Sequence, residues 1–277
     1  AAMTTHPKTI LAGYGLEPKK SLGQNFLFDD NVLRRIVDAA DLQAEDEVLE
    51  IGPGLGSLTR HLAEGAKRVV AVELDGRLLP ALQNELAGLD NVDIVHGDVL
   101  EQDAAQLFER PYKVVANVPY YITGAILRHL LGGEHKPTGM VLTVQKEVAQ
   151  RLTAVPPNMS LLAVSVLYYG EVERVTTIKA GAFWPRPDVD SAVIRIDVRR
   201  QDAGDEAQEK AFFKIVRAGF SQKRKQLQKN LRQLGNDRTA VTAALEQANI
   251  DGKRRAETLT INEWLALTAA FEALDAG

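Results

Sequence analysis

Short apolar runs rich in β-branched residues alternate with segments of helical period through roughly the first 200 residues. The runs predict strands at Glu47–Ile51, Arg68–Leu74, Val92–Val95, Lys113–Asn117, Gly139–Lys146, Val164–Tyr169, Glu173–Ile178 and Ser191–Val198. The helical period predicts helices at Asn31–Ala40, Ser57–Glu64, Arg77–Gly88 and Thr123–Leu131. Alternation of this kind is typical of an α/β protein with parallel strands and crossover helices. The closer spacing of the later strands predicts an antiparallel edge on the same sheet.

Beyond Arg200 the pattern is helical throughout. The expected helices are Glu206–Phe220, Arg224–Leu234, Arg238–Ala248 and Ile261–Ala273. The polar segment 201–205 contains a glycine and is the expected boundary. We therefore predict an α/β domain at 1–200 and a small all-helical domain at 201–277.

Composition excludes several classes of protein. The 277 residues are 45% hydrophobic and 25% charged, which is ordinary for a soluble globular chain. Because the sequence holds no cysteine, disulfides, thiolate metal sites and cysteine nucleophiles are excluded. No apolar run has the length of a membrane span, and the N-terminus lacks the layout of a signal peptide. We expect a cytoplasmic monomer with no membrane partner and no metal.

Charge is distributed unevenly along the chain. Through Val198 there are 19 Lys and Arg against 26 Asp and Glu, whereas the remainder holds 14 against 11. Seven basic residues follow one another with no acidic residue between them, namely Lys214, Arg217, Lys223, Arg224, Lys225, Lys229 and Arg232. A face of this kind suits a phosphate backbone, although a solvated helix surface explains it equally well.

The stretch VLEIGPGLGSLTRHL runs from a predicted strand through glycines into a predicted helix. Gly52, Gly54 and Gly56 allow a sharp turn and a close approach to a ligand, although such turns are often purely structural. A dinucleotide is disfavoured because Ser57 stands where G-x-G-x-x-G needs glycine, and because Glu50 would repel a pyrophosphate. The pattern favours a ligand without phosphate, such as S-adenosylmethionine.

An acidic residue stands at the end of the second strand, and another follows the third. Glu73 lies 21 residues after Gly52, where an acid can accept hydrogen bonds from both ribose hydroxyls. Asp98 follows the third strand and can reach an adenine amino group, although alone it is more typical of a helix N-cap. Because the carboxyl ends of parallel strands meet at one edge, the three features together predict a nucleoside-containing ligand there.

The fourth strand ends in an amide, a proline and two aromatic residues. The amino group of adenine is a poor nucleophile, and hydrogen-bond acceptors on its N–H groups stabilise the positive charge that develops during methylation. The Asn117 side-chain oxygen and the Val118 carbonyl are candidate acceptors, and Pro119 stiffens the turn. Tyr120 offers a face for base stacking, whereas Tyr121 is expected in the core. Taken alone, the four residues NVPY are more typical of a capped strand-to-helix turn.

Together these motifs resemble the ribosomal RNA adenine N6,N6-dimethyltransferases. The resemblance covers nearly the whole chain and rests on motifs in the order KKSLGQNFLFDDNVLRRIV, LEIGPGLGSLT, AVELD, GDVL, ANVPYYITGAIL, VQKEVAQRL and FWPRPDVDSAVIRI. It implies a Rossmann-like methyltransferase sheet in the first domain, with a lead-in segment at 1–30 that closes over the methyl donor. It also implies an rRNA-binding role for the helical domain.

The resemblance implies specific site residues as well. Those that contact S-adenosylmethionine or line its site would be Asn25, Leu27, Gly52, Glu73, Asp98 and Asn117, together with Gly54 of the glycine loop. Tyr120 and Phe183 would enclose the target adenine after it is flipped out of its stack. The basic residues Lys223, Arg224, Lys225 and Lys229 would contact RNA. The reaction would be two methylations on each of two adjacent adenines near the 3′ end of the 16S rRNA, in a maturing small subunit.

Two departures and two alternatives accompany this interpretation. Asp188 stands where the family usually has lysine, and the family's basic segment here reads KRKQLQK. These changes concern RNA docking and not the methyl transfer. One alternative is the resistance methyltransferase that modifies large-subunit rRNA. The other is a ribosome-assembly factor that acts mainly by binding.

Overall fold

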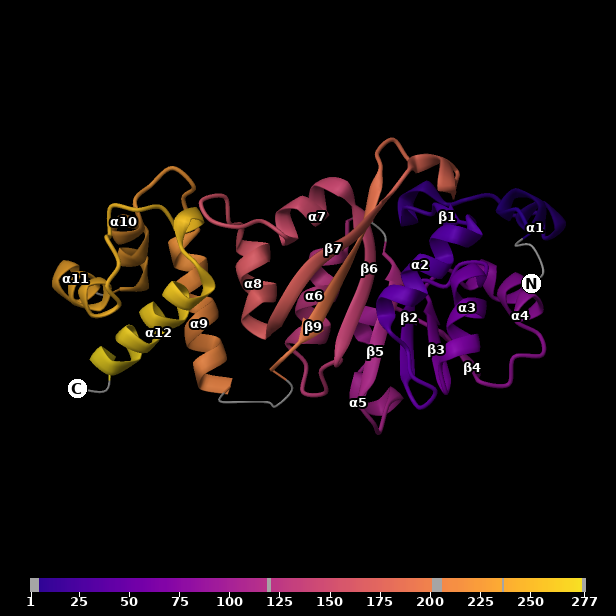
Figure 1. Cartoon of the computed structure of the whole chain (residues 1–277), viewed down its shortest axis with the longest axis horizontal. Helices are drawn as coiled ribbons and strands as arrows, with labels where there is room; N and C mark the ends of the chain where they lie inside the picture. The colour runs from indigo at the N-terminus through magenta and orange to yellow at the C-terminus, as the bar shows by residue number, and fades with distance from the viewer. Residues whose placement is uncertain (1–4, 119–120, 201–205, 236, 276–277) are drawn as a thin grey trace. The chain divides into compact units, whose positions relative to one another are not determined.

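A computed structural model describes residues 5–118, 121–200, 206–235 and 237–275. The strands are β1 (Phe26–Leu27), β2 (Glu47–Ile51), β3 (Arg68–Glu73), β4 (Val92–His96), β5 (Tyr112–Asn117), β6 (Gly139–Gln145), β7 (Gly170–Ile178), β8 (Phe183–Trp184) and β9 (Ser191–Val198). The helices are α1 (Pro7–Gly13), α2 (Asp30–Ala40), α3 (Ser57–Gly65), α4 (Leu79–Glu85), α5 (Ala104–Leu107), α6 (Thr123–Leu131), α7 (Lys146–Leu152), α8 (Leu161–Tyr169), α9 (Glu206–Gly219), α10 (Leu227–Leu231), α11 (Arg238–Gln247) and α12 (Ile261–Asp275) (Figure 1).

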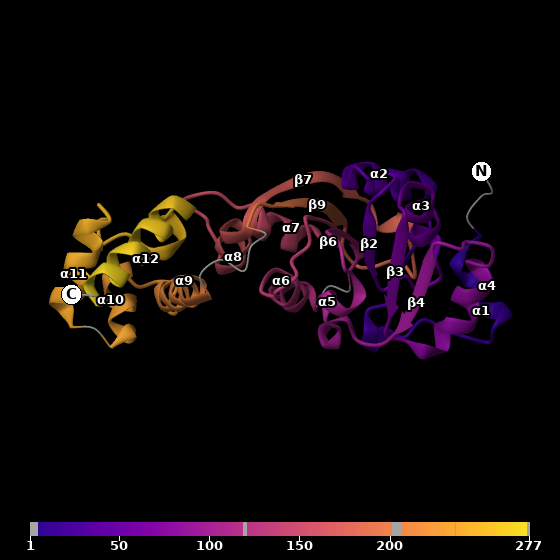
Figure 2. The same ribbon diagram turned by 90° about the horizontal axis from the view of Figure 1, so that it is seen from below.

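Seven strands form one mostly parallel sheet in the order β4-β3-β2-β5-β6-β9-β7. The pairs from β4 to β6 are parallel, and β9 is antiparallel to β6, which confirms the predicted α/β sheet with an antiparallel edge. Helices α2 and α3 cover one face, and α5 and α6 lie on the other (Figure 2). A second sheet contains only β1 and β8.

The register of the parallel strands aligns their carboxyl ends. Ile51 at the end of β2 lies opposite Val72 of β3 and Ala116 of β5. The residues that follow these three, Gly52, Glu73 and Asn117, therefore emerge at the same level of the sheet. This alignment positions the site described below.

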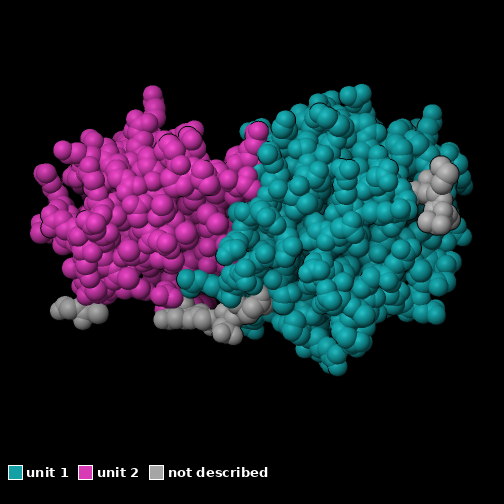
Figure 3. Space-filling model, in the orientation of Figure 1, with its two compact units in different colours: residues 1–149, 171–201 teal, residues 150–170, 202–277 magenta. Residues whose placement is uncertain are grey.

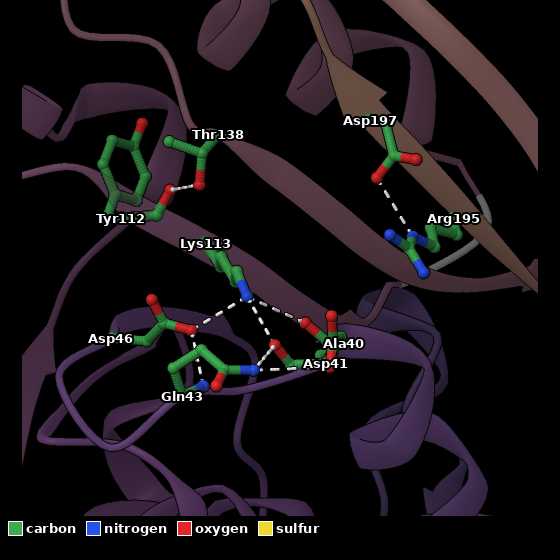
Figure 4. A network of polar contacts seen from close by, with 9 residues as sticks. All are labelled: Ala40, Asp41, Gln43, Asp46, Tyr112, Lys113, Thr138, Arg195 and Asp197. Atoms are coloured by element: carbon green, nitrogen blue, oxygen red, sulfur yellow. Dashed lines mark hydrogen bonds and ion pairs between the residues drawn. The ribbon is translucent and has the colours of Figure 1, made fainter.

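Helix α2 is fixed at both ends. The Asp29 carboxylate accepts hydrogen bonds from the backbone of the first turn, and Leu33 and Ile36 pack into the core below the helix. At the other end, the Lys113 ammonium donates to the carbonyl of Asp41 at 2.7 Å and to that of Ala40 (Figure 4). A lysine that satisfies the last carbonyls of a helix complements its dipole. Because Lys113 lies on β5, these bonds hold α2 against the strand that carries Asn117.

The chain divides into two compact units (Figure 3). The first comprises residues 1–149 and 171–201, and the second comprises 150–170 and 202–277. The predicted domain boundary, 201–205, lies outside the described residues. Segment 150–170, which the sequence placed in the first domain, belongs to the helical unit. Within that unit, α8 packs against α9 and α12.

One predicted strand is wrong. The segment Val164–Tyr169 lies in helix α8, which begins at Leu161 after the Ser160 hydroxyl accepts a hydrogen bond from the Ala163 N–H at 3.0 Å. A helix that is apolar on nearly every side shows no helical period, so its sequence is indistinguishable from a buried strand. Strand β7 then begins at Gly170, earlier than predicted.

None of the helices in the described ranges combines the length and the apolar character that a membrane span needs.

Candidate functional site

A cleft opens at the carboxyl ends of β2 to β5 and encloses about 1100 Å³ of empty space, including its open mouth. Its walls include every predicted donor-binding residue, namely Asn25, Leu27, Gly52, Gly54, Glu73, Asp98 and Asn117, together with Val118. These residues come from five separate segments of the chain. The cleft is therefore assembled by the sheet topology and by the segment that precedes α2.

The glycine loop has the backbone that its sequence predicts. Gly52, Gly54 and Gly56 have φ angles of +67°, +60° and +80°, in the left-handed region that L side chains rarely adopt. A Cβ atom on Gly54 would lie 3.0 Å from the Phe26 ring. The loop therefore needs glycine both for its turn and for the close approach of the N-terminal segment.

Glu73 is held by two backbone amides. Its Oε2 accepts a hydrogen bond from the Gly54 N–H at 3.0 Å, and its Oε1 accepts one from the Asp75 N–H at 2.8 Å. Each oxygen keeps acceptor capacity, which suits the two hydroxyls of a ribose. Burial raises the pKa of Glu73, and the two amides partly oppose that shift.

Glu50 is a second buried carboxyl in the wall of the cleft. Its side chain is 1% exposed, and its Oε2 has no hydrogen-bond partner among the described residues. Burial raises the pKa of Glu50 to about 8, an effect that the neighbouring Thr59 hydroxyl opposes and the charge of Glu73 reinforces. A cationic group entering the cleft would stabilise the ionised form of Glu50. The carboxyls in the wall of the cleft therefore fit a positively charged ligand better than an anionic one.

Asp98 caps a helical turn and also lines the cleft. Its Oδ1 accepts a hydrogen bond from the Leu100 N–H at 2.9 Å and so caps the short helical turn Val99–Glu101. The same residue lines the cleft. The cap at the start of this turn therefore places the Asp98 carboxylate at the end of β4, in the wall of the cleft.

Asn117 ends β5 with its side chain tied to the N-terminal segment. Its Nδ2 donates a hydrogen bond to the backbone carbonyl of Asn25 at 3.3 Å. Since a carbonyl only accepts, the amide nitrogen must face Asn25, which leaves the Asn117 oxygen for other partners. The backbone N–H of Val118 donates to the Thr143 carbonyl at 3.2 Å, so the chain stays anchored to β6 one residue beyond the strand. Pro119 and Tyr120 lie outside the described residues.

Strand β1 joins the cleft to the segment that carries Phe183. Leu27 pairs with Phe183 and Phe26 with Trp184 in an antiparallel ribbon. The Phe183 side chain is 3% exposed and packs in the core, and it does not line the cleft. Tyr121, in contrast, was expected in the core. It is 62% exposed and lines the cleft. The turn before α6 carries its ring away from the packed interior.

In the helical unit, the basic residues Lys223, Arg224 and Lys225 are exposed in the connection between α9 and α10. The predicted helix there, Arg224–Leu234, is shorter: α10 begins at Leu227, whose N–H donates to the Arg254 carbonyl at 2.7 Å. Lys229 is exposed on α10.

The buried Asn230 shapes this connection. Its amide nitrogen donates hydrogen bonds to the carbonyls of Gly219 at 2.6 Å and Gln222 at 3.1 Å, and so folds the basic turn back onto α9. Within the described ranges, no three His, Asp or Glu side chains are grouped to hold a metal ion.

Comparison with known proteins identifies the family. A family profile described as "Ribosomal RNA adenine dimethylase" matches residues 15–270. The chain belongs to this ribosomal RNA adenine dimethylase family. Relatives within the family include the Ribosomal RNA small subunit methyltransferase A of Dehalococcoides mccartyi, 43% identical over 98% of this chain and 94% of its own. The protein of the same name from Bacillus pumilus is 44% identical over 96% of this chain and 95% of its own.

Solved structures agree with the dimethylase fold. The 23S rRNA methyltransferase ErmE is 31% identical with a TM-score of 0.74, over 90% of this chain and all of that one. A dimethyladenosine transferase from Plasmodium falciparum is 25% identical with a TM-score of 0.78, over 90% and 98% of the two chains. Two polar residues to which the sequence assigns no role meet here, because the Gln24 amide donates a hydrogen bond to the Asp75 carboxylate at 2.8 Å. Gln24 lines the cleft, and Asp75 is 6% exposed beside it. The GQNFL motif contains Gln24, but its partner is visible only in three dimensions.

Proposed function

We propose that this chain transfers methyl groups from S-adenosylmethionine to the N6 atoms of two adjacent adenines near the 3′ end of 16S rRNA. Each adenine receives two methyl groups, and the substrate is the maturing small ribosomal subunit. The names of the relatives at 43–44% identity support the small subunit as the target. The single observation that carries the chemistry is the orientation of the Asn117 amide by the Asn25 carbonyl.

The residues of the cleft fit the methyl donor. Glu73 would accept hydrogen bonds from the ribose hydroxyls, and Asp98 would accept one from the adenine amino group of the donor. Gly52 and Gly54 bring the backbone close, while Asn25 and Leu27 close the cleft from the N-terminal side. When bound, S-adenosylmethionine supplies a methyl group made electrophilic by its sulfonium charge.

The acceptor oxygen of Asn117 and the carbonyl of Val118 act on the target amine. In the first transfer each accepts a hydrogen bond from one N–H of the adenine amino group, and in the second a single N–H remains for one of them; these bonds favour a tetrahedral nitrogen and stabilise its developing positive charge. A bond from N6 to the methyl carbon forms as the sulfur–methyl bond breaks, and the nitrogen then releases a proton to solvent. No strong general base is needed. Pro119 and Tyr120 would hold this geometry and stack the base.

In this proposal Phe183 contacts the target adenine, which its position in the structure does not yet allow. The resemblance places it on the second face of the flipped adenine, but its ring is 3% exposed within the core. Contact with the adenine would therefore need the Phe183 side chain to turn toward the cleft. The exposed residues Lys223, Arg224, Lys225 and Lys229 would hold rRNA through its phosphates, by charge and shape rather than by base readout.

Two alternatives remain to be separated from this function. A large-subunit methyltransferase is supported by the ErmE similarity at 31% identity, which is below that of the small-subunit relatives. An assembly factor that acts mainly by binding is disfavoured by the intact set of donor-binding side chains in one cleft. Purified unmethylated small and large subunits, offered together with the donor, test both. We expect methyl incorporation into the small subunit alone. In the cell, the proposed enzyme would act as a monomer in the cytoplasm.

A further inference from the structure

A chain of hydrogen bonds links the N-terminal segment, residues 19–27, to the carboxylate that the donor's ribose would meet. Gln24 begins it. Its Oε1 accepts a hydrogen bond from the Lys19 N–H at 2.7 Å, and its Nε2 donates to Asp75 Oδ2 at 2.8 Å. One neutral amide thus closes the loop of the segment on itself and crosses to the β3 side of the cleft.

Asp75 connects this amide to Glu73. Its carboxylate is nearly buried and is fixed by the Arg77 guanidinium, which donates to both oxygens. Its backbone N–H donates to Glu73 Oε1 at 2.8 Å. Glu73 is in turn tied to the glycine loop through the Gly54 N–H. The position of the Glu73 carboxylate, which would bind ribose, therefore depends on Asp75, and Asp75 is held by Gln24.

The next residue along the segment, Asn25, contacts a different part of the cleft. Asn25 lines the cleft, and its carbonyl orients the Asn117 amide. The dipeptide Gln24-Asn25 therefore contacts two sides of the cleft. The Gln24 side chain reaches Asp75, beside the carboxylate that would bind ribose, and the Asn25 carbonyl reaches Asn117, beside the place of the target amine.

We propose that Gln24 is a positioning residue for the methyl donor. By bridging Lys19 to Asp75, it holds residues 19–27 over the cleft and keeps Glu73 in the geometry that binds ribose. This inference rests on the proposed function, because it assumes that the donor's ribose meets Glu73. Glutamine suits the position because it both accepts and donates. An ionised glutamate would lose the donor and face the charge of Asp75, and asparagine is one methylene too short to span the same pair.

Two substitutions separate the hydrogen bond of Gln24 with Lys19 from its hydrogen bond with Asp75. Gln24→Met keeps the length of the side chain and removes both hydrogen bonds. Gln24→Glu keeps the acceptor for Lys19 and replaces the donor to Asp75 with a like charge. The charged groups around this position are Asp75 and Arg77, with Glu73 one hydrogen bond further on, and His96 lies against Gly76 in the same turn.

A matched control is Gln43→Met. Gln43 also donates its amide to an aspartate, Asp41, but it lies at the opposite edge of the sheet beside Lys113 (Figure 4). The control removes a glutamine–aspartate contact of the same kind without touching the cleft. It should leave donor affinity and turnover unchanged.

The experiment is titration of each purified full-length variant with S-adenosylhomocysteine and S-adenosylmethionine by calorimetry, in the absence of RNA. We expect about tenfold weaker binding for Gln24→Met, as removal of a hydrogen bond to a charged group predicts, and a larger loss for Gln24→Glu. The donor KM should rise by the same factor, whereas kcat at saturating donor should stay within about threefold, because bound donor itself holds the segment closed.

Unchanged donor affinity in both variants would overturn the inference. So would a fall in kcat as large as the rise in KM, since that outcome assigns Gln24 to the chemical step or to general stability. Failure of the proposed function is distinguishable from either result. If wild type binds the donor but labels no small subunit, the target is wrong, while the calorimetric comparison still decides the role of Gln24.

Discussion

The Asn117 side-chain amide donates a hydrogen bond to the Asn25 backbone carbonyl, with 3.3 Å between nitrogen and oxygen. The contact joins the end of β5 to a segment 92 positions earlier in the chain. It turns the amide so that its oxygen is available as an acceptor at the cleft. An acceptor in that place would serve the proposed methylation of a weakly nucleophilic amine.

The first prediction concerns this acceptor. Asn117→Ala should lower kcat by ~100-fold or more, the usual effect of removing one pre-organised hydrogen-bonding group, while the fold is retained. Turnover on unmethylated small subunits and the donor dissociation constant are the measurements. Asn84→Ala, at an exposed position on α4, is the control and should behave as wild type. Near-normal turnover in Asn117→Ala would contradict the mechanism.

The second prediction concerns the buried carboxyl of Glu50. Its pKa is raised to about 8 in the folded protein against 4.5 for the unfolded chain, so the native state binds the extra proton between these values. The free energy of unfolding should therefore fall as pH rises from about 5 to 8, by at most ~1.4 kcal/mol per pH unit from this group. Urea unfolding of wild type and Glu50→Gln across that range measures it.

Replacement by glutamine should flatten this pH dependence without abolishing it. Glu73 contributes in the same direction, because burial raises its pKa too. The relative stability of Glu50→Gln should thus be greatest at pH 8 and least at pH 5. Parallel curves for the two proteins would show that Glu50 is already ionised in the folded state.

The third prediction concerns the basic turn. Reversing Lys223, Arg224 and Lys225 to glutamate should weaken binding to the small-subunit precursor and reduce the dependence of log K on log salt, by ~0.7–0.9 for each phosphate that is no longer neutralised. The donor dissociation constant should not change. Arg110→Glu, an exposed cation of the first unit, is the control. Unaltered affinity for the precursor in the triple variant would mean that the RNA surface lies elsewhere.

The fourth prediction concerns the glycine loop. At Gly56 the φ angle is +80°, and a Cβ atom would lie 2.8 Å from Leu86 Cδ2. Gly56→Ala should lower the free energy of unfolding by ~1–2 kcal/mol through the left-handed backbone alone, with a further loss from the crowding of Leu86. Gly13→Ala is the comparison, because nothing lies within 4 Å of its Cβ position at the end of α1. Equal stability of the two variants, measured by thermal unfolding, would refute the strain argument.

The sheet and the residues that line the cleft could be predicted from the sequence because both are governed by local signals. Glycines with positive φ, and acids that follow β-branched runs, are visible in one dimension, and a parallel sheet brings strand ends to one edge. The error at α8 has the opposite cause. Its apolar residues are buried on several sides by α9 and α12, and that packing partner is absent from any local pattern.

Side-chain contacts across long separations could not be predicted. Gln24 and Asp75 lie 51 positions apart, and nothing in either local sequence shows that they meet. The expected contact of Phe183 with the target adenine stays a prediction, because its ring is packed in the core where its backbone pairs with Leu27. The shortened α10 likewise depends on the distant carbonyls of Gly252 and Arg254, which bind the N–H groups of its first turn.

The most direct test of the central claim is chemical mapping of the methylated RNA. Small subunits that lack these methyl groups are incubated with the purified protein and isotopically labelled S-adenosylmethionine, and the rRNA is digested and sequenced by mass spectrometry. The account predicts two methyl groups on N6 of each of two neighbouring adenines near the 3′ end, and ~100-fold less labelling when Asn117→Ala replaces wild type over the same interval. Label on another nucleotide, on large-subunit rRNA, or equally in both proteins would contradict it.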